Sequence, residues 1–400
     1  MDNTFRVLII GGGNCGLAIA TGLKKAGIHY TVFERDTEHD FLHKARDWGM
    51  LLHWGTEYLG RVLPDHMQKR IKEPRVDPSY EMIDPIPYIN GDTGEVLARV
   101  PTDVITRVSR KKLRRFLTEG EGLSIEYGKT LQSMKAQGDC VTVAFKDGSQ
   151  AEGNMVIGCD GSRSRVREYL VGAEAAKLEE IGLTMINYVG SGYTAEQAQL
   201  LRSYHPIVQL CFHPHLPGTI LLAALDIPDP EVTTEWLFQV YTSWWGPPFA
   251  ADLQEPAARL AFVKGRMSQF CEPYRTAFTA ISDDALLPIY AGQQWAPPTA
   301  AAWDNRGGKV TLAGDAAHSM LPHRGQGLNN AMRDASDLVD AVKLAVCGKQ
   351  TLAEVVTAYE AEMRPRGARE VALSLEQARK TRDWETVMEG PVFKQGYRRA

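Results

Sequence analysis

The stretch from Arg6 to Glu34 reads RVLIIGGGNCGLAIATGLKKAGIHYTVFE and decides the fold. Its first five residues, Arg6 to Ile10, are mostly apolar β-formers, the composition of a strand buried on both faces. A glycine-rich turn follows, then a helical segment from Leu17 to Ala26, then a second short strand from His29 to Phe33. Strand, turn, helix and strand in this order predict a βαβ unit of a parallel sheet.

The glycines of the turn have the spacing of a dinucleotide-binding loop. Gly11 permits a tight turn, Gly13 lets the backbone approach a pyrophosphate, and Gly16 lets the helix pack closely on the strand. The N-terminus of the helix offers unpaired N–H groups to phosphates. Glu34 ends the second strand, where an acidic side chain can bind ribose hydroxyls. The motif predicts a bound dinucleotide without deciding between FAD and NAD.

The composition is that of an ordinary globular protein. Of the 400 residues, 44% are hydrophobic and 24% are charged, which excludes a disordered or fibrous chain. A net charge of −4 gives no electrostatic reason to expect nucleic acid as a partner. No apolar run approaches the roughly 20 residues of a membrane span, and no basic segment precedes the first strand. We therefore expect a soluble, cytoplasmic protein that does not bind membranes.

The cysteines support this expectation. The six of them are scattered, without a CxxC pair and without the spacing of metal ligands. In a chain of this size such a pattern indicates reduced thiols in an intracellular compartment. It predicts no metal site.

Two later motifs each place a glycine–aspartate pair at the end of an apolar strand. The segment from Ala151 to Arg167 contains a strand that ends in Asp160-Gly161. The segment from Lys309 to His318 contains another, which ends in Gly314-Asp315. An aspartate in the position of Asp315 can accept hydrogen bonds from polyol hydroxyls.

The second of these motifs leads directly into a helix. Pro322 is followed by Gly325-Gln-Gly327-Leu328-Asn329, after which apolar residues recur at helical spacing. The start of such a helix presents backbone N–H groups to a ligand atom that carries negative charge.

The ordered motifs GxGxxG, DGxxSxxR and GDAAHxxxPxxGQGxN together resemble those of a known family. They are similar to the single-component, FAD-dependent aromatic monooxygenases typified by para-hydroxybenzoate hydroxylase, and the resemblance covers nearly the whole chain. The stretch from Ala45 to Gly55, ARDWGMLLHWG, looks most like the fungal members that act on secondary metabolites. The resemblance implies FAD as the cofactor, NAD(P)H as a transient co-substrate and O₂ as a second substrate.

This resemblance predicts an α/β fold in which a discontinuous, Rossmann-like FAD-binding domain carries an inserted α+β substrate domain. Residues 1–75, 100–178 and 288–350 would form the FAD-binding domain. Residues 76–99 and 179–287 would form the substrate domain, because their alternating aromatic and β-branched residues predict a mainly antiparallel sheet. Residues 351–400 would form a C-terminal helical segment, with separate helical stretches around Ala353–Met363 and Val371–Arg379.

The resemblance assigns four residues to the adenosine and phosphate end of the cofactor. Glu34 would bind the adenosine ribose, with Arg35 beside it. Arg110 would contact the FAD ribose and phosphates. Asp160 belongs to a motif linked to both FAD and NAD(P)H binding.

A second group of residues is assigned to the flavin end. Asp315 would hold the ribityl chain. The backbone of Gly327, Leu328 and Asn329 would stabilise a reduced, anionic flavin. Pro322 matches a proline that lies over the flavin near the oxygen site.

Four residues are candidates for a role at the reacting centre: Pro322, His323, Arg46 and His213. His323 stands where many relatives have Tyr or Phe, and both histidines have side chains suited to acid–base work. A surface or core role is the alternative for each of them. Strand alternation puts Gln209, Cys211 and His213 on one face as candidate pocket lining. Arg46 is compatible with a flavin or substrate contact and equally with a surface ion pair.

The implied reaction is a monooxygenation. NAD(P)H would reduce FAD, and a flavin C4a-hydroperoxide would then hydroxylate or epoxidise an aromatic or prenylated natural product, of an indole or phenolic kind, in fungal-type secondary metabolism. Two alternatives stay open: an FAD-dependent dehydrogenase or oxidase without oxygen insertion, and a non-catalytic flavin-binding protein. A flavin-dependent halogenase is disfavoured because the sequence has no GWxWxIP-like segment. Both a monomer and a homodimer are compatible with the sequence.

Overall fold

The apolar run that begins at Arg6 forms β1 (Arg6–Ile10), the central strand of a five-stranded parallel sheet. Val7, Leu8 and Ile9 are fully buried because both faces of this sheet are covered. The strands lie in the order β17 (Val310–Leu312), β11 (Met155–Gly158), β1, β2 (His29–Phe33) and β7 (Ile125–Glu126). The chain order reverses between β1 and β11, and such a switch point opens a crevice at the carboxyl ends of the strands.

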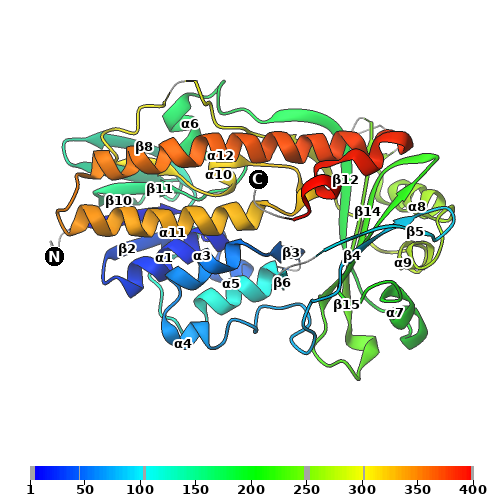
Figure 1. Ribbon diagram of the computed structural model, residues 1–400. Helices are drawn as coiled ribbons and strands as arrows, with labels where there is room; N and C mark the ends of the chain where they lie inside the picture. The colour runs from blue at the N-terminus through cyan, green and yellow to red at the C-terminus, as the bar shows by residue number, and fades with distance from the viewer. Residues whose placement is uncertain (1–4, 45, 102–104, 247–252, 301, 398–400) are drawn as a thin grey trace.

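The computed structural model describes residues 5–44, 46–101, 105–246, 253–300 and 302–397. Ala45, the first residue of the ARDWGMLLHWG stretch, lies outside this part of the chain. Figure 1 shows two lobes side by side, one around the parallel sheet and one around a larger sheet, with the long helix Leu352–Lys380 running along both.

One face of the parallel sheet is covered by α1 (Asn14–Lys25), which packs against α11 (Gly327–Val346). The close approach of α1 to the strand requires glycine at two positions. A Cβ atom on Gly16 would lie 2.2 Å from the Gly11 carbonyl oxygen. Gly11 itself has φ of +112°, and a Cβ there would lie 2.4 Å from the carbonyl oxygen of Cys159.

A three-stranded antiparallel sheet covers the other face, with strands β8 (Leu131–Gln137), β9 (Cys140–Phe145) and β10 (Gln150–Gly153). Phe145 of β9 meets Phe33 of β2 at a ring-centroid distance of 4.7 Å. Smaller elements complete this lobe: α2 (Glu38–His43), β3 (Gly49–Leu52), α3 (Gly55–Val62), α4 (Asp65–Gln68), β6 (Thr106–Ser109), α5 (Arg110–Thr118), α6 (Arg165–Val171), α10 (Asp315–His318) and the 3₁₀ turn η3 (Pro322–Arg324).

The second lobe contains a seven-stranded sheet. Its strands lie in the order β16 (Ile289–Gln294), β12 (Glu179–Gly190), β15 (Leu237–Trp245), β14 (Leu216–Asp226), β13 (Val208–His213), β4 (Ile86–Asn90) and β5 (Val96–Val100). All neighbours are antiparallel except β13 and β4, so the predicted mainly antiparallel sheet is confirmed. Beside it are the turn η1 (Thr233–Glu235) and three helices, α7 (Ala195–Leu201), α8 (Pro256–Met267) and α9 (Tyr274–Thr279) (Figure 1).

The buried apolar residues form two main clusters, one for each lobe. The C-terminal segment is shared between them. Val355 and Met363 belong to the cluster around the parallel sheet, whereas Val392 and Tyr397 belong to the cluster around the seven-stranded sheet. The exact domain boundaries stay a prediction.

The expectation of two separate C-terminal helices is wrong. The structure has one helix, α12 (Leu352–Lys380), of 29 residues, with Pro365 inside it. A proline inside a helix costs about 3 kcal/mol, but tertiary packing around it compensates, since Met363, Arg366 and Gly367 are all buried. Beyond α12 the chain turns back through η4 (Trp384–Glu389) and α13 (Pro391–Gln395).

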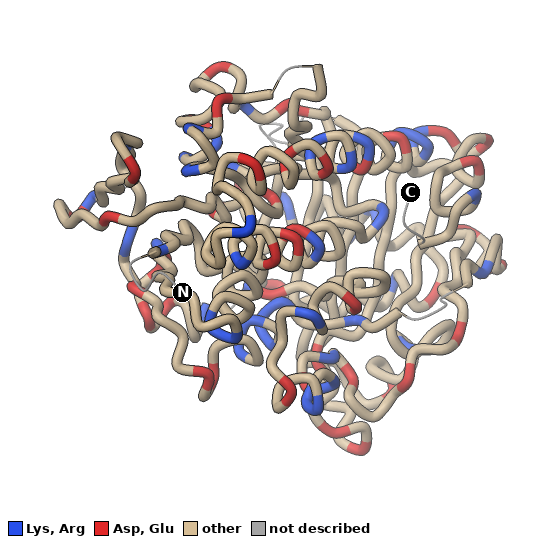
Figure 2. Tube along the Cα trace, turned by 60° about the vertical axis from the view of Figure 1, so that its left-hand side comes forward, with Lys and Arg blue, Asp and Glu red and all other residues tan. Residues whose placement is uncertain are grey.

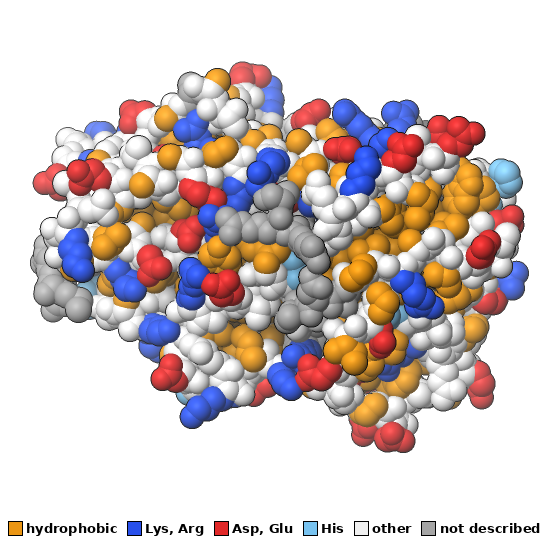
Figure 3. Space-filling view, in the orientation of Figure 1, with side chains coloured by type: hydrophobic (Ala, Val, Ile, Leu, Met, Phe, Trp, Pro, Cys, Tyr) orange, Lys and Arg blue, Asp and Glu red, His pale blue; other side chains and the backbone are white. Residues whose placement is uncertain are grey.

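Charged residues of both signs are interspersed along the chain trace (Figure 2). On the face drawn in Figure 3, hydrophobic side chains gather over the lobe that holds the seven-stranded sheet. None of the helices in the described part of the chain combines the length and the apolar character that a membrane crossing requires.

The packing of α12 on α10 predicts opposite effects for two Gly→Ala substitutions in helices. A Cβ on Gly367 would lie 2.9 Å from the Cβ of His318, whereas a Cβ on Gly265 of α8 would meet no atom within 4 Å. Gly265→Ala should raise the free energy of unfolding by about 1 kcal/mol through helix propensity. Gly367→Ala should lower it by about 1–3 kcal/mol through overpacking. Urea denaturation of both variants measures this, and equal effects would contradict the close contact.

Candidate functional site

The three sequence motifs meet at the carboxyl edge of the parallel sheet. The glycine turn follows β1, Asp160 follows β11 and Asp315 follows β17, and these three strands are neighbours. Backbone hydrogen bonds continue the pairing past the strand ends, from Cys159 N to Ile10 O at 2.7 Å and from Ala313 N to Gly158 O at 2.9 Å. The switch point of the sheet therefore gathers residues that are some 300 positions apart in the chain.

The glycine turn leaves space in front of the N-terminus of α1. A Cβ on Gly13 would meet no atom within 4 Å, and the first turn of α1 carries no acidic residue. The buried side-chain oxygen of Asn14 has no hydrogen-bond partner among the described residues. Open space and a helix N-terminus without a side-chain cap fit a phosphate group of a cofactor, whereas the Asn14 oxygen is an acceptor and fits a donor such as a hydroxyl.

Glu34 is placed beside this turn, and Arg35 points to the surface. One carboxylate oxygen of Glu34 accepts from Gly12 N at 2.8 Å and the other from Asp36 N at 2.9 Å. The carboxylate thus shapes the loop itself and keeps lone pairs for a ribose. Arg35 is exposed.

Asp160 and Arg167 brace the second motif. One oxygen of Asp160 accepts from Arg165 N at 2.7 Å, while the other is buried without a partner in the described structure. Burial raises the pKa of this carboxyl. The guanidinium of Arg167 donates to the carbonyl oxygens of Ala176, Ala316 and Ser162. This bond to Ala316 ties α6 to the segment that carries Asp315.

Asp315 stands just beyond the carboxyl end of β17, at the switch-point edge of the parallel sheet. The residue is exposed, and desolvation by the surrounding protein raises the pKa of its carboxyl. His318, Arg110 and Arg167 act on it in the opposite direction. A carboxylate at this position can accept hydrogen bonds from the hydroxyls of a bound polyol chain.

A buried charge network that the motifs did not reveal holds the Asp315 segment. Asp334 of α11 is fully buried. One of its oxygens accepts from Gly314 N at 2.8 Å and lies 2.7 Å from His318 Nε2, and the other accepts from Arg366 at 2.7 Å. Burial opposes ionisation, but His318 and Arg366 hold the pKa of Asp334 below its usual range. The sequence feature that could have indicated this network is an aspartate, Asp334, on the apolar face of the helix that starts at Gly327.

α11 starts at Gly327, and its first turns pack beside the Asp315 segment, where a Cβ on Gly314 would lie 3.6 Å from the Cβ of Ala331. Leu328 is 9% exposed and Asn329 is fully buried. The Asn329 side chain accepts from His53 N at 2.9 Å and donates to Leu51 O at 3.0 Å, so it fastens α11 to β3. Only the backbone of Asn329 is left for a cofactor contact.

Two guanidinium groups lie near the ring of Trp48. Arg110 is 4.7 Å from its ring centroid and Arg46 is 5.0 Å from it. Arg46 also lies 4.9 Å from the ring of Tyr290 on β16. Arg46 is exposed. The stacking joins Arg46 and Arg110 into one group, and through Tyr290 it reaches the seven-stranded sheet.

The turn η3 brings Pro322 and His323 to the boundary between the lobes. His323 meets Tyr241 of β15 edge to face, at a ring-centroid distance of 6.4 Å. The next residue, Arg324, is fully buried and pairs with Glu370 of α12 at 2.6 Å. Burial lowers the pKa of His323 to about 4, so its imidazole is neutral at pH 7. Pro322 is exposed.

The structure does not bring His213 to this boundary. Leu210 of β13 pairs with Leu221 of β14, and Leu221 pairs with Tyr241 of β15. These three side chains therefore point to the same face of the sheet. Gln209 and Cys211 have the opposite parity and point the other way. A register shift separates Cys211 from His213, which packs on Phe270 at a ring-centroid distance of 4.7 Å. The expectation that the face of Gln209, Cys211 and His213 lines the pocket chose the wrong side of the strand, because alternation alone does not say which face meets the cofactor lobe.

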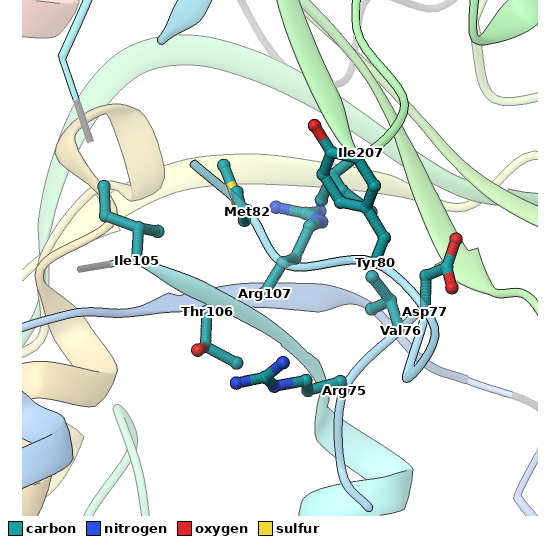
Figure 4. Close-up of a pocket in the computed structure, with 9 residues that line it drawn as sticks. All are labelled: Arg75, Val76, Asp77, Tyr80, Met82, Ile105, Thr106, Arg107 and Ile207. Atoms are coloured by element: carbon teal, nitrogen blue, oxygen red, sulfur yellow. The ribbon is translucent and has the colours of Figure 1, made fainter. Parts of the chain in front are cut away.

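A second feature is a small cavity beside Arg107 (Figure 4). It measures about 10 Å³ and has room for roughly one water molecule. The Arg107 side chain donates to Ala224 O at 3.3 Å and to the side chain of Gln239. Burial lowers the pKa of Arg107 to about 10. A cavity of this size excludes an organic substrate.

Taken together, the cleft has the donor set of an FAD site. Helix N-termini and the open Gly13 fit the phosphates, and Asp315 fits the ribityl hydroxyls. The fold and these groups define a flavoprotein of the Rossmann-like, two-lobed kind.

Comparisons with known proteins identify the family. Residues 272–374 match the family model described as an FAD binding domain. The FAD-dependent monooxygenase phnB of Penicillium herquei is 34% identical over 401 residues, covering 98% of this chain and 94% of that protein. The FAD-dependent monooxygenase cctM of Talaromyces islandicus is 35% identical over 400 residues, covering 98% and 96%. The chain belongs to the FAD-dependent monooxygenases, and its cofactor is FAD.

Two solved structures support the fold. A putative FAD-containing monooxygenase from Photorhabdus luminescens superimposes with a TM-score of 0.76 at 24% identity, covering 95% of this chain and 99% of that one. The HpxO protein of Klebsiella pneumoniae, solved with FAD and uric acid, superimposes with a TM-score of 0.74 at 20% identity, covering 98% and 92%. At these identities the likeness concerns the fold.

Asp315→Ala should release the flavin while the chain still folds. Hydrogen bonds to a charged group contribute about 1.5–3 kcal/mol each, so FAD should bind at least about tenfold more weakly. The flavin absorbance of the purified protein and its far-ultraviolet circular dichroism measure the two effects. The control is Asp139→Ala, which removes an exposed carboxylate. Full flavin occupancy in Asp315→Ala would overturn the assignment.

His53 makes the protein less stable in acid. Its Nε2 lies 3.0 Å from Asn329 Nδ2, and burial lowers its pKa from 6.5 to about 4. Between these two pH values the unfolded chain takes up a proton that the folded chain does not, so stability falls as the pH falls, by at most about 1.4 kcal/mol per pH unit. His53→Gln should flatten the dependence of the unfolding free energy on pH from 6.5 to 4.5. His39→Gln, at a side chain that is 83% exposed, should leave it unchanged, and an unaltered slope in His53→Gln would contradict the prediction.

Proposed function

We propose that this FAD-dependent monooxygenase uses NAD(P)H and O₂ to hydroxylate or epoxidise an aromatic or prenylated natural product in fungal-type secondary metabolism. The observation that carries the proposal is the contact between His323 and Tyr241, at 6.4 Å between ring centroids. It puts the turn that follows the cofactor motif directly against the seven-stranded sheet. The similarity to fungal monooxygenases over 98% of the chain adds support.

The chain's own residues would bind and orient the reactants. Bound FAD supplies the redox and oxygen-transfer chemistry. The N-terminus of α1 would hold the phosphates, with Glu34 and Arg35 toward the adenosine. Asp315 would hold the ribityl chain. The N-terminus of α11 would stabilise negative charge on the ring system through its free N–H groups.

Two further contributions would come from the boundary between the lobes. Pro322 and the facing sheet would exclude water from the reacting centre. Arg46 is exposed beside Trp48 and Tyr290, where it would contact the flavin or the substrate. Because the sequence contains one GxGxxG motif, we propose that NAD(P)H binds transiently in the same cleft.

Oxygen incorporation tests this function. The purified yellow protein should oxidise NADH or NADPH in the presence of a suitable hydroxylated naphthalene or prenylated indole. Under ¹⁸O₂ the product should gain one labelled oxygen atom, as read by mass spectrometry. The flavin-free Asp315→Ala protein is the blank. Turnover of NAD(P)H and substrate without labelled product would favour the dehydrogenase or oxidase alternative.

A further inference from the structure

Two cysteines from different sequence motifs meet in the folded chain. Cys15 stands in the glycine turn, at the first turn of α1, and Cys159 directly precedes Asp160 at the end of β11. Their thiol groups form a hydrogen bond with each other, and both cysteines are free. Two thiols in direct contact are the starting arrangement for a disulfide bond.

The backbone around the pair is tightly packed. Cys159 N donates to Ile10 O at 2.7 Å, which fixes the end of β11 beside the strand that leads into the glycine turn. A Cβ on Gly16, the residue after Cys15, would lie 3.3 Å from the Cβ of Cys159. A Cβ on Gly11 would lie 2.4 Å from the Cys159 carbonyl oxygen. Because the two segments are already in contact, a displacement of Cys159 is transmitted to the turn.

Cys15 also contacts the rest of the cofactor edge. Its thiol donates to the carbonyl oxygen of Ala331 in α11 at 3.5 Å. A Cβ on Gly314, which precedes Asp315, would lie 3.1 Å from the Cβ of Cys15. The thiol pair therefore stands where the glycine turn, the Asp160 motif and the Asp315 motif meet. A covalent bond between the two sulfur atoms would act on all three motifs at once.

A disulfide at this place would disturb the phosphate site. The sulfur atoms of a disulfide are about 2.05 Å apart, closer than two thiols in a hydrogen bond. The contraction draws the first turn of α1 and the end of β11 toward each other. Since Gly16 and Gly11 already touch Cys159, the turn has to shift, and its N–H groups lose the arrangement that holds a pyrophosphate.

The oxidant has to be small. Cys15 is 9% exposed and Cys159 is 8% exposed, so bulky reagents have little access to either residue. The hydrogen bond to Cys159, together with burial, raises the pKa of the Cys15 thiol, and a protonated thiol does not react with bulk oxidants as readily as a thiolate. Hydrogen peroxide is small, and it forms at the flavin itself when reduced flavin gives its electrons to O₂ without transferring oxygen to a substrate.

We propose that Cys15 and Cys159 form a modification site, at which hydrogen peroxide produces a disulfide that makes the protein release FAD. The enzyme thereby loses its cofactor, reversibly, when its flavin generates peroxide instead of an oxygenated product. The proposal depends on the FAD site and not on the identity of the substrate.

The oxidation takes place in two balanced steps. One sulfur attacks the peroxide, so that an S–O bond forms, the O–O bond breaks, and the departing hydroxide takes the thiol proton and leaves as water. The second sulfur attacks the resulting sulfenic acid, so that the S–S bond forms, the S–O bond breaks and a second water leaves. In total the two thiols lose two hydrogen atoms, and one peroxide is reduced to two waters.

Peroxide treatment of the flavin-loaded protein tests the pair without NAD(P)H or substrate. After the remaining free thiols are blocked with N-ethylmaleimide, peptide mass mapping should find Cys15 linked to Cys159. One FAD should be released for each disulfide formed, as read by flavin fluorescence after ultrafiltration. Dithiothreitol should reduce the disulfide and restore FAD binding.

Variants assign the release to the pair. Cys15→Ala and Cys159→Ala remove one sulfur each, so both should keep FAD bound under the same peroxide treatment. The matched control is Cys347→Ser, which removes an exposed thiol. This variant should release FAD as the wild type does. In the wild type, oxidation of Cys347 shows that the peroxide dose is sufficient.

Three results would overturn the proposal. The first is the absence of a link between Cys15 and Cys159 at a dose that oxidises Cys347 completely. The second is a link that leaves FAD bound, and the third is equal FAD release from Cys159→Ala. The first is decided on the wild type, so it holds even if a variant binds FAD poorly. Because no oxygen transfer to a substrate is measured, failure here and failure of ¹⁸O incorporation are separate results.

Discussion

The fully buried carboxylate of Asp334 joins three segments that the chain order keeps apart. It receives the backbone N–H of Gly314, lies against His318 and pairs with Arg366 of α12. A buried charge is costly to desolvate, and removal of one partner from such a pair typically costs about 3–5 kcal/mol. The end of β17, α11 and α12 are thus held in one arrangement, and the position of Asp315 in the cleft depends on it.

The position of α12 affects the arrangement of both lobes. α12 also carries Glu370, which anchors Arg324 and so fixes the turn that presents His323 to the seven-stranded sheet. The same long helix therefore positions both Asp315, which we propose to hold the ribityl chain of FAD, and His323, which contacts Tyr241 of the seven-stranded sheet. This explains why α12 continues through Pro365: its buried face has contacts on both sides of the proline.

Local patterns predicted the cofactor lobe well. β1, β2 and the helix at Gly327 lie where the sequence places them, because glycine turns and apolar strands leave few alternatives. The substrate side was less predictable. The alternation in β13 separated two faces correctly but did not say which one meets the cofactor, and His213 is on the face that packs on Phe270. The Asp334 network was also beyond local patterns, since its members lie on different elements.

The sequence by itself determined the βαβ unit that starts at Arg6 and, through three ordered motifs at strand ends, the family resemblance that implies FAD. Three motifs at strand ends require glycine or aspartate for reasons of backbone geometry and hydrogen bonding, and those reasons are local. Only the tertiary structure decided which side chains face the reacting centre. Tyr241 and His323 are more than 80 positions apart in the chain, and they meet because a buried ion pair between Arg324 of η3 and Glu370 of α12 and the register of a seven-stranded sheet bring two separate surfaces together.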